Sequence, residues 1–141
     1  MAQSCFKSVS VGGMVTVVPP KIRTFDEDAK LFDMEPKQLA RIKKTIGLDR
    51  RHVVEDDVTT LDLCISAAED LLQGMNIDKD KIDGLICVTQ TPDHFQPCNA
   101  AIIHGQLELS TDCASFDVNL GCSGFVYGLW LAHMMIETNS C

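Results

Sequence analysis

The sequence predicts an α/β fold with a mixed, largely parallel sheet, and three features carry this prediction. Strand-like and helix-like segments alternate along the chain. The run from Gly84 to Thr89 is short and continuously apolar, as in a strand that is buried on both faces of a sheet. Apolar residues alternate from Phe116 to Leu120 and return at helical spacing after residue 124, which predicts a strand, a sharp turn and a helix.

The first sixty residues predict one strand and two short helices. Valines alternate loosely through residues 6–18 around Gly12-Gly13, which predicts a first strand with a glycine break. The pattern is helical from residue 26 to 45, with Pro36 starting the second helix and Gly47 ending it. Residues 48–54 then predict a loop or an edge strand.

The following residues lead to the turn after residue 120. Thr59 or Thr60 can cap a helix that reaches Met75 and should be the longest in the chain. A charged turn at residues 78–83 precedes the buried strand. A loop with two prolines, residues 91–97, leads into a helix from residue 98 to about residue 108.

Composition is that of an ordinary globular protein. The chain has 141 residues, of which 45% are apolar and 23% charged, so residues 1–141 are expected to form one domain. The net charge of −8 disfavours nucleic acid and an anionic membrane as partners, because both need clustered Lys and Arg. Only residues 41–44 and 50–51 are locally basic, so an acidic partner would have to dock there.

The cysteines and carboxylates predict no metal and no cofactor. The seven cysteines are an odd number without a Cys-x-x-Cys pair, and several lie in apolar runs, which is typical of small core side chains. The carboxylate clusters at residues 26–28 and 55–57 lack calcium-loop spacing and are interpreted as solvated helix starts. No secretory leader is visible and no apolar run could span a membrane, so a cytoplasmic location is expected.

Cys122 is the candidate nucleophile. It lies between Gly121 and Gly124 at the start of the predicted helix, where free backbone N–H groups and the helix dipole favour an anion. The thiol is therefore expected to ionise more readily than a free cysteine, and the missing Cβ atoms allow a substrate to approach. A buried structural cysteine on a tight turn fits the same residues equally well.

Three segments resemble one enzyme family. The segment Asp117 to Tyr127, DVNLGCSGFVY, resembles the active-site segment of β-ketoacyl-acyl-carrier-protein synthase III, a thiolase-fold condensing enzyme. Two others match in order: residues 46–52, IGLDRRH, and residues 82–93, IDGLICVTQTPD, followed by Pro97 and Ala100-Ala101. The resemblance covers nearly the whole chain.

The resemblance implies a fold and an activity. It implies a thiolase-like α/β/α half that is incomplete at its C-terminal end, the N-terminal half of a longer enzyme. Cys122 would accept an acyl group, and a malonyl-carrier thioester would condense with it. The implied partners are an acyl thioester, an acyl carrier protein and a second copy in a homodimer. Phe125 would line one wall of the acyl site.

Two implied substrate-binding positions depart from the family pattern. Arg41 and Thr45 align where many members have a tryptophan and an arginine that hold the adenine end of coenzyme A, which favours acyl-carrier donors. The family's decarboxylating histidine and asparagine belong to the second half, so the fragment itself is expected to be inactive. Two other interpretations stay open: a non-catalytic half-domain that dimerises or docks a partner, and a redox-sensing thiol.

Overall fold

The computed structural model describes residues 3–30 and 34–139, which divide into two compact units. One unit comprises residues 1–17 and 59–141, and the other comprises residues 18–58. The first is called the catalytic-turn unit here because it contains the turn of Cys122, the predicted nucleophile. The second is called the basic-helix unit after its longest helix. Each is described by itself.

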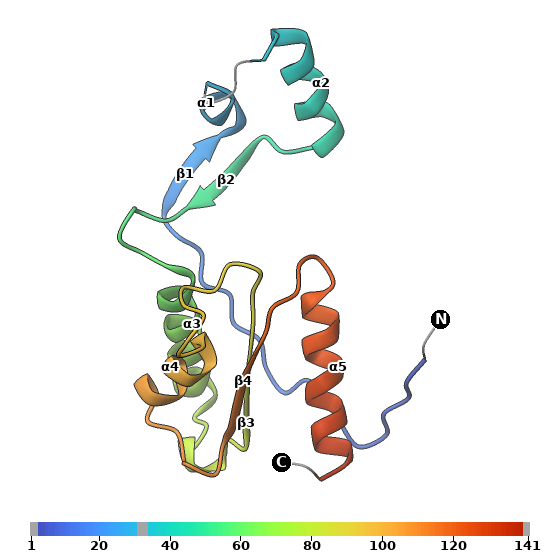
Figure 1. The fold of residues 1–141 in the computed structure, drawn as a ribbon, viewed down its shortest axis with the longest axis vertical. Coiled ribbons are helices and arrows are strands. Elements are labelled where there is room, and N and C mark those ends of the chain that lie inside the picture. The colour runs from blue at the N-terminus through green and yellow to red at the C-terminus, as the bar shows by residue number, and fades with distance from the viewer. Residues whose placement is uncertain (1–2, 31–33, 140–141) are drawn as a thin grey trace. The chain divides into compact units, whose positions relative to one another are not determined.

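The catalytic-turn unit has three layers, helix on sheet on helix (Figure 1). Strands β3 and β4 pair in parallel, with Gly84 opposite Ala114 and Val88 opposite Val118. Helices α3 and α4 cover one face of this sheet and α5 covers the other. The bounds are α3 Thr60–Met75, a short 3-10 turn Lys79–Lys81, β3 Gly84–Val88, α4 Asn99–Gln106, β4 Ala114–Val118 and α5 Gly124–Glu137. These elements confirm the α/β prediction and the predicted strand, turn and helix around Cys122.

The core of this unit lies between the sheet and the α3–α4 layer. Its buried side chains come from β3, from α4 and from the turn before β4. They are Cys87, Ala100, Ile103, Leu107, Leu109 and Cys113. Helix α3 packs against this cluster with a stripe that includes Leu61, Ile65 and Leu72, as its spacing predicted, and Thr59 caps it together with Asp62.

Helix α5 lies unusually close to β3 because two glycines face the strand. A Cβ atom on Gly124 would come within 2.9 Å of Val88 Cγ1, and one on Gly128 within 2.6 Å of Val88 Cγ2. Real side chains do not approach so closely, so only glycine fits at these two positions. The contact fixes where the first turn of α5 lies on the sheet.

The basic-helix unit is a two-stranded antiparallel sheet, and two helices connect its strands along the chain. Strand β1, Lys21–Thr24, pairs with β2, Arg50–Val53. Between them lie α1, Phe25–Ala29, and α2, Pro36–Ile46, which ends at Gly47 in the left-handed region with φ 70°. The two predicted short helices and the edge strand are confirmed.

A buried carboxylate holds the basic-helix unit together. Asp28 is only 7% exposed and accepts a 2.8 Å hydrogen bond from Arg51 Nε, while Arg23 Nε lies 3.2 Å from its other oxygen. The two arginines lie on different strands, so the carboxylate of α1 bridges both. The expectation that residues 26–28 form a solvated cluster was wrong for Asp28, because burial of a charge requires partners that composition does not reveal.

The predicted strand at residues 6–18 is absent, since these residues make no ladder with another strand. The beginning of the segment instead lies along α5: Ser4 accepts a hydrogen bond from Trp130 Nε1 (2.9 Å), and the backbone N–H of Ser8 donates to Glu137 (3.2 Å). Gly13 lies against Met75 at the end of α3. Alternating valines predict extended backbone, but they do not predict which partner is available to pair with it.

Substitution of Gly128 by alanine should test the close α5–β3 contact. We expect Gly128→Ala to destabilise the chain by about 1 kcal/mol or more, because the new methyl group overpacks Val88 and the stiff β-branched side chain cannot move aside. Urea unfolding followed by circular dichroism gives the free energy of unfolding.

Gly74→Ala is the matched control, since a Cβ there meets nothing within 4 Å and alanine favours a helix by up to about 1 kcal/mol. Adding Val88→Ala to Gly128→Ala should recover part of the lost free energy of unfolding, because the side chain that the new methyl group meets is then removed. Equal effects of Gly128→Ala and Gly74→Ala would show that the contact is not tight.

Candidate active site

The turn that carries Cys122 connects the end of β4 to the start of α5. The Gly124 N–H donates to the Gly121 carbonyl at 2.8 Å, which closes the turn, and the Tyr127 N–H donates to the Ser123 carbonyl at 3.1 Å, which begins the helix. Cys122 is free and exposed at the tip. Its backbone N–H has no hydrogen-bond partner among residues 3–30 and 34–139. The turn therefore offers an accessible thiol next to an available amide donor.

The carboxyl ends of β3 and β4 bring a second loop beside this turn. Gly121 lies so near the loop after β3 that a Cβ atom there would come within 3.1 Å of Gln90 Oε1. The amide of Gln90 is thus close to the residue that precedes Cys122. Gln90 was not predicted as a site residue, although adjacent parallel strands end at the same edge of a sheet and the residues that follow them are neighbours.

A buried polar network holds the loop after β3. The Asp117 carboxylate on β4 accepts hydrogen bonds from the backbone N–H groups of Asn99 (3.0 Å) and Ala100 (2.7 Å), and so caps α4, whose N-cap residue makes no side-chain cap of its own. Asn99 is fully buried and accepts from the Asp93 N–H at 3.2 Å. Asp93 in turn accepts from the Leu61 N–H at the start of α3, at 3.3 Å.

This network was missed from the sequence, although one signal pointed to it. Asp117 is a carboxylate within the apolar run Phe116–Val118, and a charge inside a buried strand needs donors nearby. The structure supplies them from the N-terminus of α4, where the dipole also favours an anion. Strand β4 ends just before the Cys122 turn. The network connects this strand to the starts of both α3 and α4.

The histidines of the chain make contacts that do not involve Cys122. Ring nitrogens of His52, His104 and His133 lie 2.6–2.9 Å from the backbone carbonyl oxygens of Pro19, Ser110 and Leu129 respectively. His94 is exposed in the loop after β3. No hydrogen bond joins any of them to Cys122 within the described ranges. Among the described residues, no histidine is thus in place as a proton-transfer partner for the thiol.

The predicted site residues fall into two groups. Cys122 and Phe125 lie on the same turn, with Phe125 in the first turn of α5 and 67% exposed. Arg41 and Thr45 lie one turn apart on α2 in the other unit, where the Thr45 hydroxyl donates to the Arg41 carbonyl at 2.8 Å. The structure brings the members of each pair together, and the two pairs belong to separate units.

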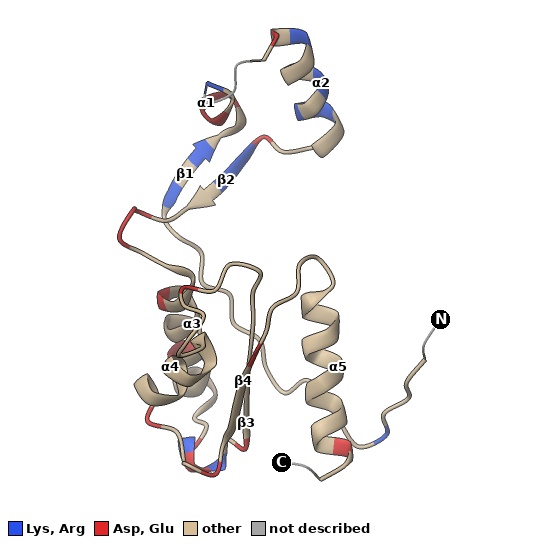
Figure 2. Ribbon diagram, in the orientation of Figure 1, with Lys and Arg blue, Asp and Glu red and all other residues tan. Residues whose placement is uncertain are grey.

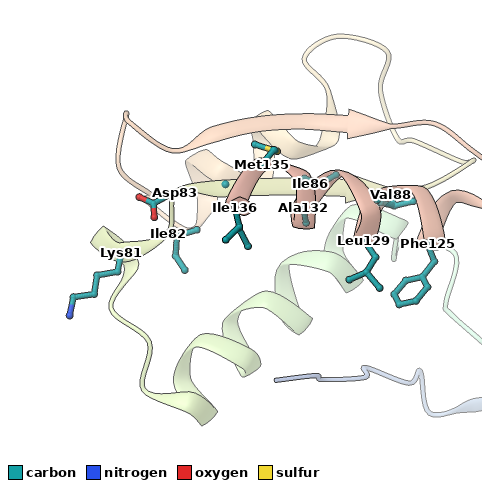
Figure 3. A pocket seen from close by; sticks show the side chains of 12 residues that line it. Lys81, Ile82, Asp83, Ile86, Val88, Phe125, Leu129, Ala132, Met135 and Ile136 are labelled. Atoms are coloured by element: carbon teal, nitrogen blue, oxygen red, sulfur yellow. The ribbon is translucent and has the colours of Figure 1, made fainter. Parts of the chain in front are cut away.

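An open groove of about 700 Å³ begins at Phe125 and follows α5 along β3 (Figure 3). Its walls are mostly apolar. They comprise Gly84, Ile86 and Val88 of β3, Phe125, Gly128, Leu129, Ala132, Met135 and Ile136 of α5, and Lys81, Ile82 and Asp83 before β3. Within the described residues β3 pairs only with β4, so its other edge is open beside this groove.

A second pair of thiols lies in the core. Cys64 on α3 packs against the cluster that contains Cys87 of β3, and a hydrogen bond from the Cys87 thiol to the Cys64 thiolate would lower the pKa of Cys64 to about 7 and raise that of Cys87. Cys87 is buried and stays protonated as the donor, whereas Cys64 is half-buried. No local pattern predicts this pair, because twenty-two residues separate the two cysteines in the sequence.

The described part of the chain shows neither a metal site nor a membrane span. It contains no group of three His, Cys, Asp or Glu side chains that could hold a metal ion. None of its helices is both long and apolar enough to cross a bilayer.

Comparisons with known proteins point to one family. The chain is 41% identical over 134 residues to a putative 3-oxoacyl-[acyl-carrier-protein] synthase 3 of Campylobacter jejuni, a match that covers 94% of this chain and 38% of that protein. It is 38% identical over 130 residues to the β-ketoacyl-[acyl-carrier-protein] synthase III of Rickettsia prowazekii, covering 92% and 39%. No protein-family model matches the sequence.

Solved structures give the same result. A 3-oxoacyl-(acyl-carrier protein) synthase from Burkholderia xenovorans superposes with a TM-score of 0.77 at 37% identity, over 86% of this chain and 34% of that one. OleA of Xanthomonas campestris superposes with a TM-score of 0.84 at 29% identity, over 96% and 40%.

The fold is thus that of the thiolase-like synthases. The chain belongs with the β-ketoacyl-acyl-carrier-protein synthases III, which it matches over most of its own length. It spans about two fifths of the length of the curated relatives it matches, 38% and 39% for the two named above.

The Cys64–Cys87 pair generates a pH prediction. Because the pKa of Cys64 is lowered from 9.0 to about 7, its thiolate should persist to lower pH than that of a free cysteine. Iodoacetamide labelling of Cys64, located by peptide mass spectrometry, should therefore rise through about pH 7 rather than pH 9.

The variant Cys87→Ala removes the hydrogen-bond donor, so the labelling profile of Cys64 should move toward higher pH. A profile that is the same with and without Cys87 would disprove the proposed hydrogen bond.

Proposed function

We propose that residues 1–141 form the N-terminal thiolase-like domain of a longer condensing enzyme in which Cys122 accepts the acyl group. The observation that carries this proposal is the exposed thiol of Cys122 on a two-glycine turn at the start of α5, in a chain 41% identical to a putative 3-oxoacyl-carrier-protein synthase. The chemistry requires a nucleophile that a thioester can reach, and the turn meets this requirement.

In the first step the Cys122 thiolate attacks the carbonyl carbon of an acyl thioester. A new bond forms between Sγ and this carbon, the bond to the donor sulfur breaks, and the donor leaves as a thiol. The unpartnered N–H of Cys122 would stabilise the oxyanion, with a second donor from the rest of the protein.

In the second step a malonyl-carrier thioester loses carbon dioxide. The resulting carbanion attacks the acyl-Cys122 thioester, a carbon–carbon bond forms, and the cysteine is released. This step needs proton-handling and oxyanion-stabilising groups that the resemblance assigns to the second half. Three of the four histidines place a ring nitrogen near a backbone carbonyl oxygen and not near Cys122. This supports the assignment of the proton-handling groups to the second half.

We propose an acyl-carrier thioester as the donor, with Phe125 bordering the acyl site. The Thr45 hydroxyl already donates to its own helix, and the planar stacking group found there in many family members is missing. The free cysteines among the described residues agree with a reducing, cytoplasmic location.

A second candidate function is that of a non-catalytic half-domain that dimerises or docks a partner. One observation favours it: helix α5 exposes large apolar side chains beside the open groove. They are Phe125, Val126, Tyr127, Leu129, Trp130 and Ile136. Such contiguous apolar surface usually marks a protein-protein contact.

This apolar surface predicts self-association of the isolated chain. We expect residues 1–141 to form dimers or larger species at micromolar concentration in sedimentation velocity. The reason is that exposure of this apolar surface to water is unfavourable in free energy. Val126→Lys together with Ile136→Lys should shift the distribution toward monomer. A clean monomer for the unsubstituted chain contradicts both the half-fold and the homodimer proposal.

The division of the catalytic residues predicts activity by complementation. Residues 1–141 alone should not condense malonyl-carrier with an acyl donor. A chimera that joins them to the C-terminal part of the Campylobacter jejuni relative should do so, and Cys122→Ala should lower this rate by at least about 1,000-fold.

Product formation is measured by mass spectrometry of the carrier-bound product, and circular dichroism checks that each chimera is folded. Condensation by the 141-residue chain alone would place the missing groups within it. A folded chimera that stays active with Cys122→Ala would rule out Cys122 as the nucleophile.

A further inference from the structure

Cysteines from three elements converge on the buried core cluster of the catalytic-turn unit. Cys87 of β3 is 5% exposed and belongs to this cluster. Cys64 of α3 and Cys98, which directly precedes α4, are partly buried and pack against it. Cys113 also belongs to the cluster, but Asp117, the ladder partner of Cys87, lies four residues after it, which is about 13 Å along a strand. Cys64 and Cys98 are therefore the candidate partners of Cys87.

The Asp117 network fixes the elements that carry these cysteines. Cys87 and Asp117 are directly opposite each other in the parallel ladder, so their side chains lie on the same face of the sheet. On this face the Asp117 carboxylate accepts from the first N–H groups of α4, while Asp93 accepts from the Leu61 N–H in the first turn of α3. Cys64 follows Leu61 by three residues and lies one turn further on the same side of α3. The network thus helps to hold Cys64 over the strand of Cys87.

The elements around these thiols carry no Lys or Arg. Helices α3 and α4 and strands β3 and β4 contain neither residue type (Figure 2). A hydrogen bond from Cys87 lowers the pKa of Cys64, whereas burial and the carboxylates of Asp93 and Asp117 raise it. The acidity of Cys64 therefore depends on Cys87 and not on a cation, and such a hydrogen bond requires the two sulfur atoms to be in contact.

We propose that Cys64 and Cys87 form a redox pair, in which a peroxide oxidises Cys64 and Cys87 then closes a disulfide between α3 and β3. A redox-sensing thiol must be accessible and must have a second thiol beside it that resolves the oxidised form. Cys64 is partly exposed, and Cys87 is buried in the cluster against which Cys64 packs. The pair is separate from the proposed nucleophile, so this inference does not depend on the role of Cys122.

The proposed reaction has two steps, and hydrogen peroxide is the oxidant. In the first, the Cys64 thiolate attacks one peroxide oxygen, the O–O bond breaks, and a sulfenic acid forms while hydroxide leaves and is protonated to water. In the second, the Cys87 sulfur attacks the sulfur of the sulfenic acid. The S–O bond breaks, and the hydroxide leaves as water with the proton of Cys87. Two thiols are thus oxidised to one disulfide, and the peroxide is reduced to water.

The first step prepares Cys87 for the second. The hydrogen bond to Cys64 raises the pKa of Cys87, and burial and the negative charge of Cys64 raise it further. The sulfenic acid is neutral, so its formation removes the anionic acceptor and the repulsion between two thiolates. Cys87 then loses its proton more easily, and it does so next to the sulfur that it must attack.

Peptide mapping after hydrogen peroxide treatment of the 141-residue chain tests the proposal. Trypsin leaves Cys87 and Cys98 in one peptide, because no Lys or Arg lies between them. A protease that cleaves before aspartate separates them at Asp93 and releases Cys64 in a peptide of its own. Remaining thiols are blocked with iodoacetamide before digestion. The monomer band of a non-reducing gel should yield the Cys64 peptide linked to the Cys87 peptide, and dithiothreitol should abolish this link.

Three variants assign the two sulfur atoms. Cys98→Ala is the matched control, since Cys98 packs against the same cluster, and it should still form the link. Cys87→Ala should lose the link, and dimedone should then trap Cys64 as the sulfenic acid. Circular dichroism checks the fold, and Cys87→Ser, which nearly preserves the side-chain size, replaces the alanine variant if that variant is unfolded. Cys122→Ala should form the same link as the parent chain.

The disulfide should also stabilise the folded chain, because it closes a loop from residue 64 to residue 87 in the unfolded state. The oxidised parent should therefore unfold at a higher temperature than the reduced parent, and Cys87→Ala should not show this rise after the same treatment. The proposal is wrong if peroxide produces no link, if Cys64 is linked to Cys98 instead, or if the link forms without raising the unfolding temperature.

Discussion

The contact of Gly124 and Gly128 with Val88 is the constraint on which the candidate site depends. Because two turns of α5 lack side chains where they cross β3, the helix approaches the sheet to a distance that any larger residue would prevent. The first turn of α5 is then held at the carboxyl edge of the sheet, and the residue just before it is Cys122. A helix displaced by one methyl group would move the thiol relative to every group it must act with.

The Asp117 network stabilises the same carboxyl edge of the sheet from the face that α3 and α4 cover. It connects β4 to the starts of α3 and α4 through backbone N–H groups that would otherwise be unpaired. The loop after β3, which includes Gln90, is thereby anchored near the turn of Cys122. The site thus rests on close packing on one side of the sheet and on helix capping on the other.

The sequence predicts the features whose signals are local. The Thr59 cap, the stripe of α3, the stop at Gly47 and the turn around Cys122 each depend on neighbouring residues, and the structure contains all of them. Features that join distant segments escaped prediction. The valine-rich segment 6–18 has no ladder partner, Asp28 bridges two strands, and Cys64 meets Cys87, because such pairings are set by tertiary packing rather than by local pattern.

The most direct test of the account is to locate the acyl group after the 141-residue chain reacts with a short-chain acyl thioester of N-acetylcysteamine. Peptide mass spectrometry distinguishes the cysteines, and the half-buried, acidic Cys64 is the internal competitor. The account predicts slow acylation of Cys122, absent in Cys122→Ala and unchanged in Cys64→Ala. An acyl group found on Cys64 while Cys122 stays unmodified would contradict it.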